Sequence, residues 1–327
     1  MIRRLLAVAF AAACVVGLTT GTAEAKTTLK LATMAPKQSP WGKVFTKWSD
    51  VVKSKTNGEV EIEWLWNGVG GPEDAVVGKI KSGQLDGAAI TAVGLSSIDK
   101  GVLALQVPGA FKSWAELDKA RNKVAGKFKR SMKKEGFYVA GWGDVGKARV
   151  MSAGFAVKTP ADLKGKSPAT IKDDVIAPAI YEIIGGVTPK PGAITEFLPM
   201  LQNKSVNVMN TPALAAEQLQ WASRLDHMNT QEVAFAIGAL VLSESSLDKM
   251  PADQAKLVKR YGKSASKRLT KSIRSADDAS FNRLKKKMTS HTPTDAERAE
   301  WQRVFKAACG KLKTSLPGSV LSDIGAC

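Results

Sequence analysis

The chain has 327 residues, which is enough for one large domain or two ordinary domains with a proper core. Hydrophobic residues make up 44% of it and charged residues 24%, values that are typical of a globular protein, and past the N-terminus no apolar run is long enough to span a bilayer. The formal net charge of +18 would suit nucleic acid or an anionic membrane surface, but much of it lies between residues 256 and 287 at helical spacing, which favours a solvated helix face.

Residues 1–25 have the pattern of a secretory signal peptide. Two arginines precede an apolar run from Leu5 to Leu18, and Ala23-Glu24-Ala25 forms a cleavage site. The run is too short for a transmembrane anchor, and lipoprotein processing at Cys14 is disfavoured because the expected leucine is missing. We expect cleavage after Ala25, a periplasmic protein with a net charge of about 18 − 1 = +17, and no nucleic-acid partner.

The mature chain begins with short apolar strands that alternate with amphipathic helices. Residues 28–32 and 60–66 are predicted strands, and the helix between them starts at Ser39-Pro40, a cap followed by proline. Lys79–Thr91 then contains a helix end, a glycine stop at Gly83 and a buried strand. Such alternation predicts a mainly parallel sheet covered by helices, and we assign residues 26–145 to a first lobe.

A second copy of the unit at Lys79–Thr91 occurs at Phe197–Thr211, which indicates a second, similar lobe at residues 146–232. The apolar run Val233–Leu242 is expected to return the chain to the first lobe. Residues 251–288 contain almost no helix breaker and predict one helix of roughly 50 Å that braces both lobes. A last helix is predicted at 294–313, so residues 233–327 hold the return segment, the bridging helix and the C-terminal helix.

No catalytic or metal-binding motif is present. The two histidines, His227 and His291, lie in different regions, and the sequence has no H-E-x-x-H, C-x-x-C or G-x-S-x-G pattern. The glycine-rich segment 68–71 lacks the spacing of a phosphate-binding loop, so a tight strand-to-helix turn is favoured. We therefore expect no enzyme activity, no metal and no cofactor. Cys309 and Cys327 are candidates for a disulfide in an oxidising compartment.

Aromatic residues indicate where a ligand would lie. Trp66 is at the C-terminal end of a predicted strand, beside the glycine-rich turn, and ligands of open α/β sheets bind just beyond such ends. Core packing is the expected role of Trp64. For Trp66, Trp142 and Phe155, pocket lining and core packing both remain open.

Several segments in the same order and spacing as in a known family make the chain resemble the solute-binding proteins of TRAP transporters, of the DctP type. These segments are Leu31-Ala32-Thr33 with Pro36 and Ser39-Pro40, Gly83–Gly87, Thr159–Gly165, Pro189, Glu196, Leu201-Gln202, Val206-Asn207 and Pro212. The resemblance implies a two-lobed periplasmic binding protein fold of class α/β. Each lobe would be a mainly parallel sheet flanked by helices, with a long C-terminal helix bracing both.

The same resemblance implies a periplasmic, non-enzymatic receptor that closes around a small solute and delivers it to the membrane permease of the transporter. The chain is also similar to a subgroup associated with tetratricopeptide-repeat proteins, which implies such a protein as a further partner.

The chain departs from the family where the solute's carboxylate is held. The family's clamping arginine falls on Ala169, a second arginine that some members use falls on Phe155, and an asparagine falls on Thr211, beside Asn210. Losing a bidentate guanidinium is not conservative, so we expect a neutral or hydrophobic solute. The alternatives are an organic acid held by Arg149 or Lys147, an exported enzyme on the same fold, and a carrier of hydrophobic ligands that works without a permease.

The predicted ligand site combines strand ends from both lobes with the crossover between them. Its residues are Met34, Trp41, Trp66, Asn67, Gly68, Thr91, Ala92, Trp142, Arg149, Phe155, Ala169, Met209, Asn210, Thr211 and Phe235.

Overall fold

The computed structural model describes residues 26–327, so the predicted signal peptide, with Cys14 and the cleavage site, lies outside the described residues. The strands are β1 (Thr27–Thr33), β2 (Val60–Leu65), β3 (Gly87–Thr91), β4 (Phe137–Ser152), β5 (Ala169–Ile171), β6 (Lys190–Gly192), β7 (Val208–Pro212), β8 (His227–Asn229), β9 (Ala234–Ser243) and β10 (Thr289–His291).

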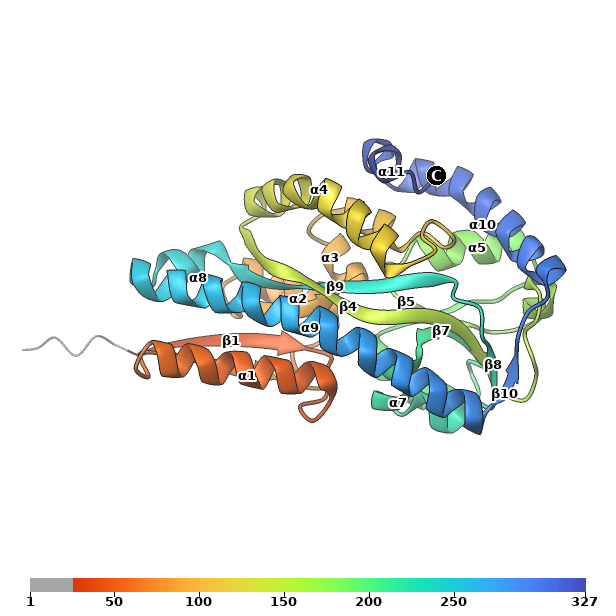
Figure 1. The fold of residues 1–327 in the computed structure, drawn as a ribbon, viewed down its shortest axis with the longest axis horizontal. Coiled ribbons are helices and arrows are strands. Elements are labelled where there is room, and N and C mark those ends of the chain that lie inside the picture. The colour runs from red at the N-terminus through yellow and green to blue at the C-terminus, as the bar shows by residue number, and fades with distance from the viewer. Residues whose placement is uncertain (1–25) are drawn as a thin grey trace, which may run out of the picture.

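Helices cover these strands on both faces (Figure 1). The α-helices are α1 (Pro40–Lys55), α2 (Glu73–Lys81), α3 (Ala92–Ser96), α4 (Trp114–Lys134), α5 (Ile176–Ile184), α6 (Phe197–Gln202), α7 (Ala213–Gln218), α8 (Glu244–Asp248), α9 (Ala252–Lys287), α10 (Asp295–Ser315) and α11 (Gly318–Ile324). Short 3-10 helices are η1 (Lys100–Gln106), η2 (Pro160–Leu163), η3 (Ile194–Glu196) and η4 (Trp221–Arg224).

One eight-stranded sheet runs through the molecule in the order β10-β8-β4-β9-β3-β1-β2, with β7 paired to β4, while β5 and β6 form a separate small sheet. β1 lies between β2 and β3 and is parallel to both, as the alternation predicts. β9 lies antiparallel between β3 and β4. The return segment predicted from the apolar run is therefore the strand that joins the parallel strands of the first lobe to the rest of the sheet.

The apolar pattern predicts two strands, at residues 137–142 and 147–156, whereas the structure has one continuous strand, β4, at Phe137–Ser152. The strand continues through two register shifts, between Val139 and Gly141 and between Asp144 and Gly146, so the glycines mark β-bulges rather than strand ends. A Cβ on Gly141 would lie 2.5 Å from the Cβ of Ser266, so the missing side chain lets α9 approach β4 closely. The predicted lobe boundary at 145/146 falls inside this strand.

Helix starts follow the signals in the sequence. Ser39 caps α1 by accepting a hydrogen bond from the Gly42 amide at 3.2 Å, and Pro40 is the first residue of that helix. α10 begins with a capping box, in which the Glu297 carboxylate accepts a hydrogen bond from the Thr294 amide at 2.7 Å. Gly83 follows α2 with φ of +75°, a conformation that favours glycine.

The predicted bridging helix is confirmed as α9, whose 36 residues span roughly 54 Å at 1.5 Å per residue. It packs against α1, β4 and α7, and Figure 1 shows it crossing in front of the sheet from α8 to β10. Buried Asp277 of α9 accepts hydrogen bonds from the Lys147 amide of β4 at 2.9 Å and the Leu214 amide of α7 at 3.0 Å. One carboxylate of the helix therefore holds two separate elements.

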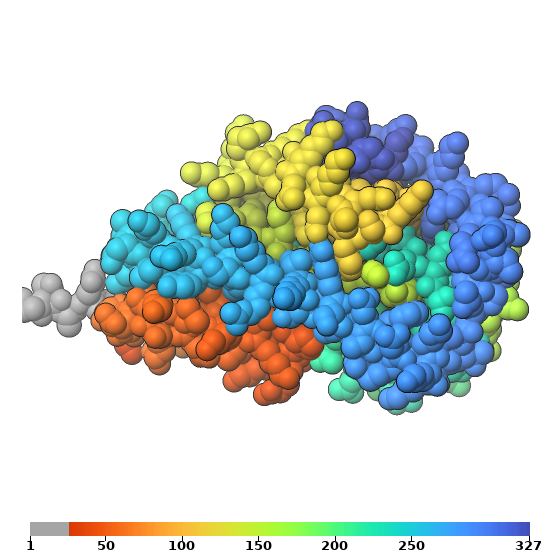
Figure 2. Space-filling model, in the orientation of Figure 1, coloured from red at the N-terminus to blue at the C-terminus, as the bar shows by residue number. Residues whose placement is uncertain are grey.

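The solvent side of α9 carries the positive charge that dominates the composition. The cations exposed there between residues 256 and 271 are Lys256, Arg260, Lys263, Lys267, Arg268 and Lys271. Figure 2 shows α9 in blue beside α4 in yellow and α1 in orange-red on this face of the molecule. This arrangement agrees with the predicted solvated helix face.

Three apolar clusters form the core. The first joins η1, α4, β9 and α10, and the second joins the segment from α6 to η4 with the middle of α9. The third lies between α1, the strands β1 and β2, and the start of α9. The second cluster also takes in Trp41 and Phe45 of α1, so helices from both ends of the chain share one core.

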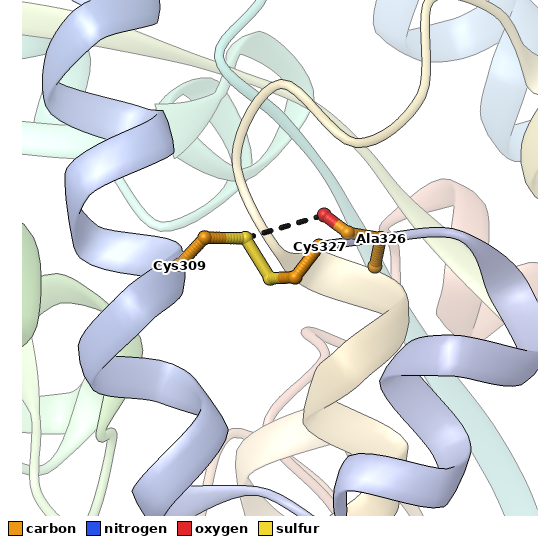
Figure 3. Close-up of a disulfide and its surroundings, with 3 residues drawn as sticks. All are labelled: Cys309, Ala326 and Cys327. Carbon is orange, nitrogen blue, oxygen red and sulfur yellow. Dashed lines mark hydrogen bonds between the residues drawn. A yellow bond between two sulfur atoms is a disulfide. The ribbon is translucent and has the colours of Figure 1, made fainter.

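The cysteine pair is bonded in the structure (Figure 3). Cys309 of α10 and Cys327 at the C-terminus form a disulfide with Cα atoms 5.6 Å apart, as the sequence suggested. The bond fastens the segment that contains α11 to α10, and α11 in turn contacts α4.

Replacing both Cys309 and Cys327 by serine should lower the free energy of unfolding by about 3 kcal/mol, because the bond closes a loop of 18 residues in the unfolded chain. Urea unfolding followed by circular dichroism measures the loss, and unfolding of the unmodified protein in reducing buffer should reproduce it. An unchanged unfolding midpoint in both experiments would contradict the prediction.

Candidate functional site

A cavity of about 240 Å³ lies where the strand ends of the two lobes face each other. The first lobe contributes the end of β1, the start of α1 and the end of β3, and the second lobe contributes β5, α5, β7 and α7. The strand β9 passes along its wall. Parallel strands place their C-terminal ends on one edge of a sheet, which is why residues far apart in sequence meet here.

Eight of the fifteen predicted site residues line this cavity. They are Met34, Trp41, Thr91, Ala169, Met209, Asn210, Thr211 and Phe235. The two copies of the helix–turn–strand unit thus lie on opposite walls, Thr91 at the end of β3 and Met209 to Thr211 on β7, as the repeat predicts.

The predicted aromatic residues Trp66, Trp142 and Phe155 lie outside the lining. Trp66 stacks on Trp64 with ring centroids 5.3 Å apart. Trp142 meets Phe128 of α4 edge to face at 5.8 Å, and Phe155 lies under the ammonium group of Lys166 at 4.0 Å. Each of the three rings thus packs against another side chain of the protein and is absent from the cavity lining.

Asn67, Gly68 and Ala92 also lie outside the lining. Asn67 and Gly68 form the turn after β2 and both have positive φ, which confirms the tight strand-to-helix turn as its conformation. A Cβ on Gly68 would lie 2.6 Å from Cγ2 of Thr195, so this turn touches the second lobe directly. Ala92 is fully buried at the start of α3.

Arg149 and Lys147, the cations expected to rescue acid binding, point away from the cavity. Arg149 is buried, with its Nη2 3.0 Å from Glu232 and its guanidinium 4.0 Å from the ring centroid of Phe281 on α9. The ammonium group of Lys147 lies 3.0 Å from Glu232. Because side chains alternate along a strand, Ala148 between them faces the cavity while both cations face the helix.

The titratable residues that line the cavity, by contrast, are acidic. Among the described residues that line it, none is Arg, Lys or His, and the titratable ones are Glu73, Asp144 and Asp174. Asp144 is fully buried, and two guanidinium groups compensate its negative charge. Arg121 and Arg274 each lie 2.7 Å from one of its carboxylate oxygens.

Glu73 is held by its own lobe. It accepts hydrogen bonds from the amide of Thr91 at 2.9 Å, the hydroxyl of Thr91 at 2.5 Å and the amide of Gly94 at 3.2 Å. Burial raises the pKa of the Glu73 carboxyl, although these donors oppose the rise. The residue ties the start of α2 to the end of β3.

The lobes meet beside the cavity through a weak polar contact. Lys172, which follows β5, lies with its Nζ 3.9 Å from the Asp74 carboxylate of α2, and both side chains are largely exposed. A partly exposed pair of this kind contributes little to stability.

Sequence reasoning missed several lining residues, including Gln106, Asp144, Thr170, Asp174 and Trp221. Asp174 follows the short strand β5, so the rule that ligands bind beyond strand ends, applied to the second lobe, would have found it. Gln106 and Asp144 carry no such signal, because their place depends on how η1 and β4 pack.

Within residues 26–327, no three His, Cys, Asp or Glu side chains are grouped so that they could hold a metal ion. No helix in the same range is long and apolar enough to cross a membrane.

Comparison with known proteins places this geometry in a family. The model of the bacterial extracellular solute-binding proteins, family 7, matches residues 31–314. A solute-binding protein of Roseobacter denitrificans is 24% identical over 260 residues, which are 76% of each chain. The 2,3-diketo-L-gulonate-binding periplasmic protein of Escherichia coli is 24% identical over 167 residues, 51% of this chain and 50% of that protein.

Solved structures share the fold along nearly the whole chain. A TRAP periplasmic solute binding protein of Sulfurospirillum deleyianum with bound succinate has a TM-score of 0.86 at 19% identity, covering 92% of this chain and 99% of that one. One from Haemophilus influenzae with bound L-gulonate has a TM-score of 0.83 at 17% identity, with the same coverage. The fold is therefore that of the two-lobed TRAP periplasmic binding proteins, with a long C-terminal helix.

Replacing Arg274 by methionine should lower the free energy of unfolding by about 3 kcal/mol, because buried Asp144 loses one of its two cations. Thermal or urea unfolding measures this. The matched control is Lys271→Met on the exposed face of the same helix, at a side chain without an ion pair in the described residues, and it should leave stability almost unchanged. Equal losses in the two variants would show that the network around Asp144 contributes nothing specific.

Proposed function

The chain belongs to family 7 of the bacterial extracellular solute-binding proteins, and on this basis we propose that it is the periplasmic receptor of a TRAP-type transporter for a small, neutral or largely hydrophobic solute. The two lobes close on the solute, and the receptor delivers it to the membrane permease of the transporter. Its role is binding without catalysis, and it needs no cofactor.

The proposed ligand class rests on one observation: among the described residues that line the cavity, none is Arg, Lys or His. A bound carboxylate loses its hydration and requires a charged or strongly donating partner. Ala169, where the resemblance places the family's clamping arginine, lines the cavity. Around it, Met209, Phe197 and Trp221 offer apolar surface, which favours an apolar solute by about 25 cal/mol per Å² buried.

An organic acid is the second candidate, and the comparisons favour it over a neutral solute. Succinate and L-gulonate are bound in two of the similar structures, and the Escherichia coli relative is named for 2,3-diketo-L-gulonate. In this chain, such a ligand would need a cation from outside the lining. Arg149 and Lys147 would have to leave Glu232 to supply it.

Further features of the proposal rest on sequence alone. They are export by residues 1–25, division into lobes at 26–145 and 146–232, and the tetratricopeptide-repeat partner, for which the comparisons offer no support. A carrier that works without a permease is an alternative. The exposed cations of α9 are consistent with it, because a basic surface attracts anionic membranes.

Native mass spectrometry of the purified protein tests the ligand class. We expect a bound molecule that is neutral or largely hydrophobic, and its release on denaturation allows identification. Recovery of a small dicarboxylate or sugar acid would instead establish the second candidate.

A second prediction concerns a variant that places a guanidinium group in the cavity. Ala169→Arg should abolish binding of apolar solutes and produce measurable affinity for simple carboxylates such as succinate, because a bidentate donor then enters the cavity. Isothermal titration calorimetry measures both. Ala169→Met is the control for added volume and should weaken apolar binding without any gain for succinate. Strong succinate binding by the unmodified protein would contradict the expectation.

A further inference from the structure

Asp174 differs from the other acids of the cavity because its charge is not compensated. Asp144 has two guanidinium partners, and Glu73 accepts three hydrogen bonds from its own lobe. Within the described residues, no Lys, Arg or His lies within ion-pair distance of Asp174, and its only hydrogen bonds come from two backbone amides.

Those two bonds leave much of the carboxylate unused. Oδ1 accepts from the Ile176 amide at 2.8 Å, which begins α5, while Oδ2 has a single long contact of 3.4 Å to the Ala177 amide. An ionised carboxylate offers about four acceptor positions. Burial raises the pKa of the Asp174 carboxyl, although the two amide hydrogen bonds oppose the rise.

Two polar neighbours face the same cavity without a partner of their own. The hydroxyl of Thr170 on β5 and the amide of Asn210 on β7 line it, and neither side chain makes a hydrogen bond to another described residue. Pockets for small molecules commonly combine apolar walls with a few such polar groups that fix the ligand's orientation.

Aromatic side chains also line the cavity. They include Trp41, Phe197 and Trp221. The faces of aromatic rings attract cations, and they do so more strongly when water is excluded. Acidic and aromatic groups together suit a positively charged head group and repel a carboxylate.

We propose that Asp174 is the ligand anchor of the cavity and selects solutes that carry a protonated amine, or more weakly a hydroxyl, on an otherwise apolar body. This inference rests on the proposed receptor function and defines its substrate class more narrowly. Asp174 accepts the hydrogen bond from the ligand's donor group, Thr170 and Asn210 orient that group, and the apolar walls hold the body. The absence of the arginine clamp and the uncompensated carboxylate of Asp174 thus both favour a protonated amine over a carboxylate.

Three small molecules of similar shape, which differ in their head group, test this preference. Phenethylamine, phenethyl alcohol and hydrocinnamate share a phenyl ring and a short chain and end in an ammonium, a hydroxyl and a carboxylate. Calorimetric titration of the unmodified protein should give the tightest binding for the amine, weaker binding for the alcohol and the weakest for the acid.

The variant Asp174→Asn removes the charge and keeps a side-chain oxygen that can accept from the Ile176 amide at the start of α5. It should weaken binding of the amine about tenfold or more, a change of roughly 1.4 kcal/mol, with a smaller loss for the alcohol and a gain for hydrocinnamate. Asp173→Asn is the matched control, because it removes the same charge from an exposed neighbour that does not line the cavity, and it should change none of the three affinities.

Unchanged amine binding in Asp174→Asn, with thermal unfolding like that of the unmodified protein, would overturn the role of Asp174. So would failure of the unmodified protein to bind the amine. If phenethyl alcohol still binds in either case, the receptor for apolar solutes stands and only the anchor is refuted. A preference of the unmodified protein for hydrocinnamate over both other probes would refute the anchor and the neutral ligand class together.

Discussion

A single turn of α9 couples the parts of this molecule that form the cavity. Arg274 pairs with Asp144 on β4 and with Asp118 on α4, while Asp277, one turn later, accepts hydrogen bonds from the amides of Lys147 and Leu214. Both groups are buried or half-buried, so neither lobe can leave the helix without exposing an unpaired charge or amide. The strands that carry the cavity walls are therefore held in place by a helix behind them.

This arrangement also explains the polarity of the cavity. The cations near β4 form ion pairs on the side of the strand that faces α9. Arg149 and Lys147 pair there with Glu232, and Arg274 pairs with Asp144. The opposite side of the strand contributes Ala148 and Gly143 to the lining. A protein with a high net positive charge thus has a cavity whose titratable residues are acidic, and the charge of the whole chain says nothing about its ligand.

In our proposal, the difference from the acid-binding proteins of the same fold lies in one wall of the cavity. The fold is shared along the chain, and succinate or sugar acids occupy several of the related structures. Here, Ala169 stands where the resemblance places the carboxylate clamp, and Asp174 a few residues later presents an acceptor instead of a donor. Because binding free energy comes from a small number of such groups, a change of two side chains can reverse the charge preference while the fold stays the same.

The sequence by itself determined the local structure: Ser39, Gly83 and the pair Thr294 and Glu297 set helix ends through bonds to adjacent backbone groups, and periodicity alone indicated α9. It also predicted Thr91 and Asn210 as site residues, and both line the cavity. Only the tertiary structure decided that β4 is one bulged strand, that Arg149 faces α9, and that Trp66 and Trp142 belong to the core. Those outcomes depend on which elements pack together over long separations, and a side chain's partner across a sheet leaves no periodic signal along the chain.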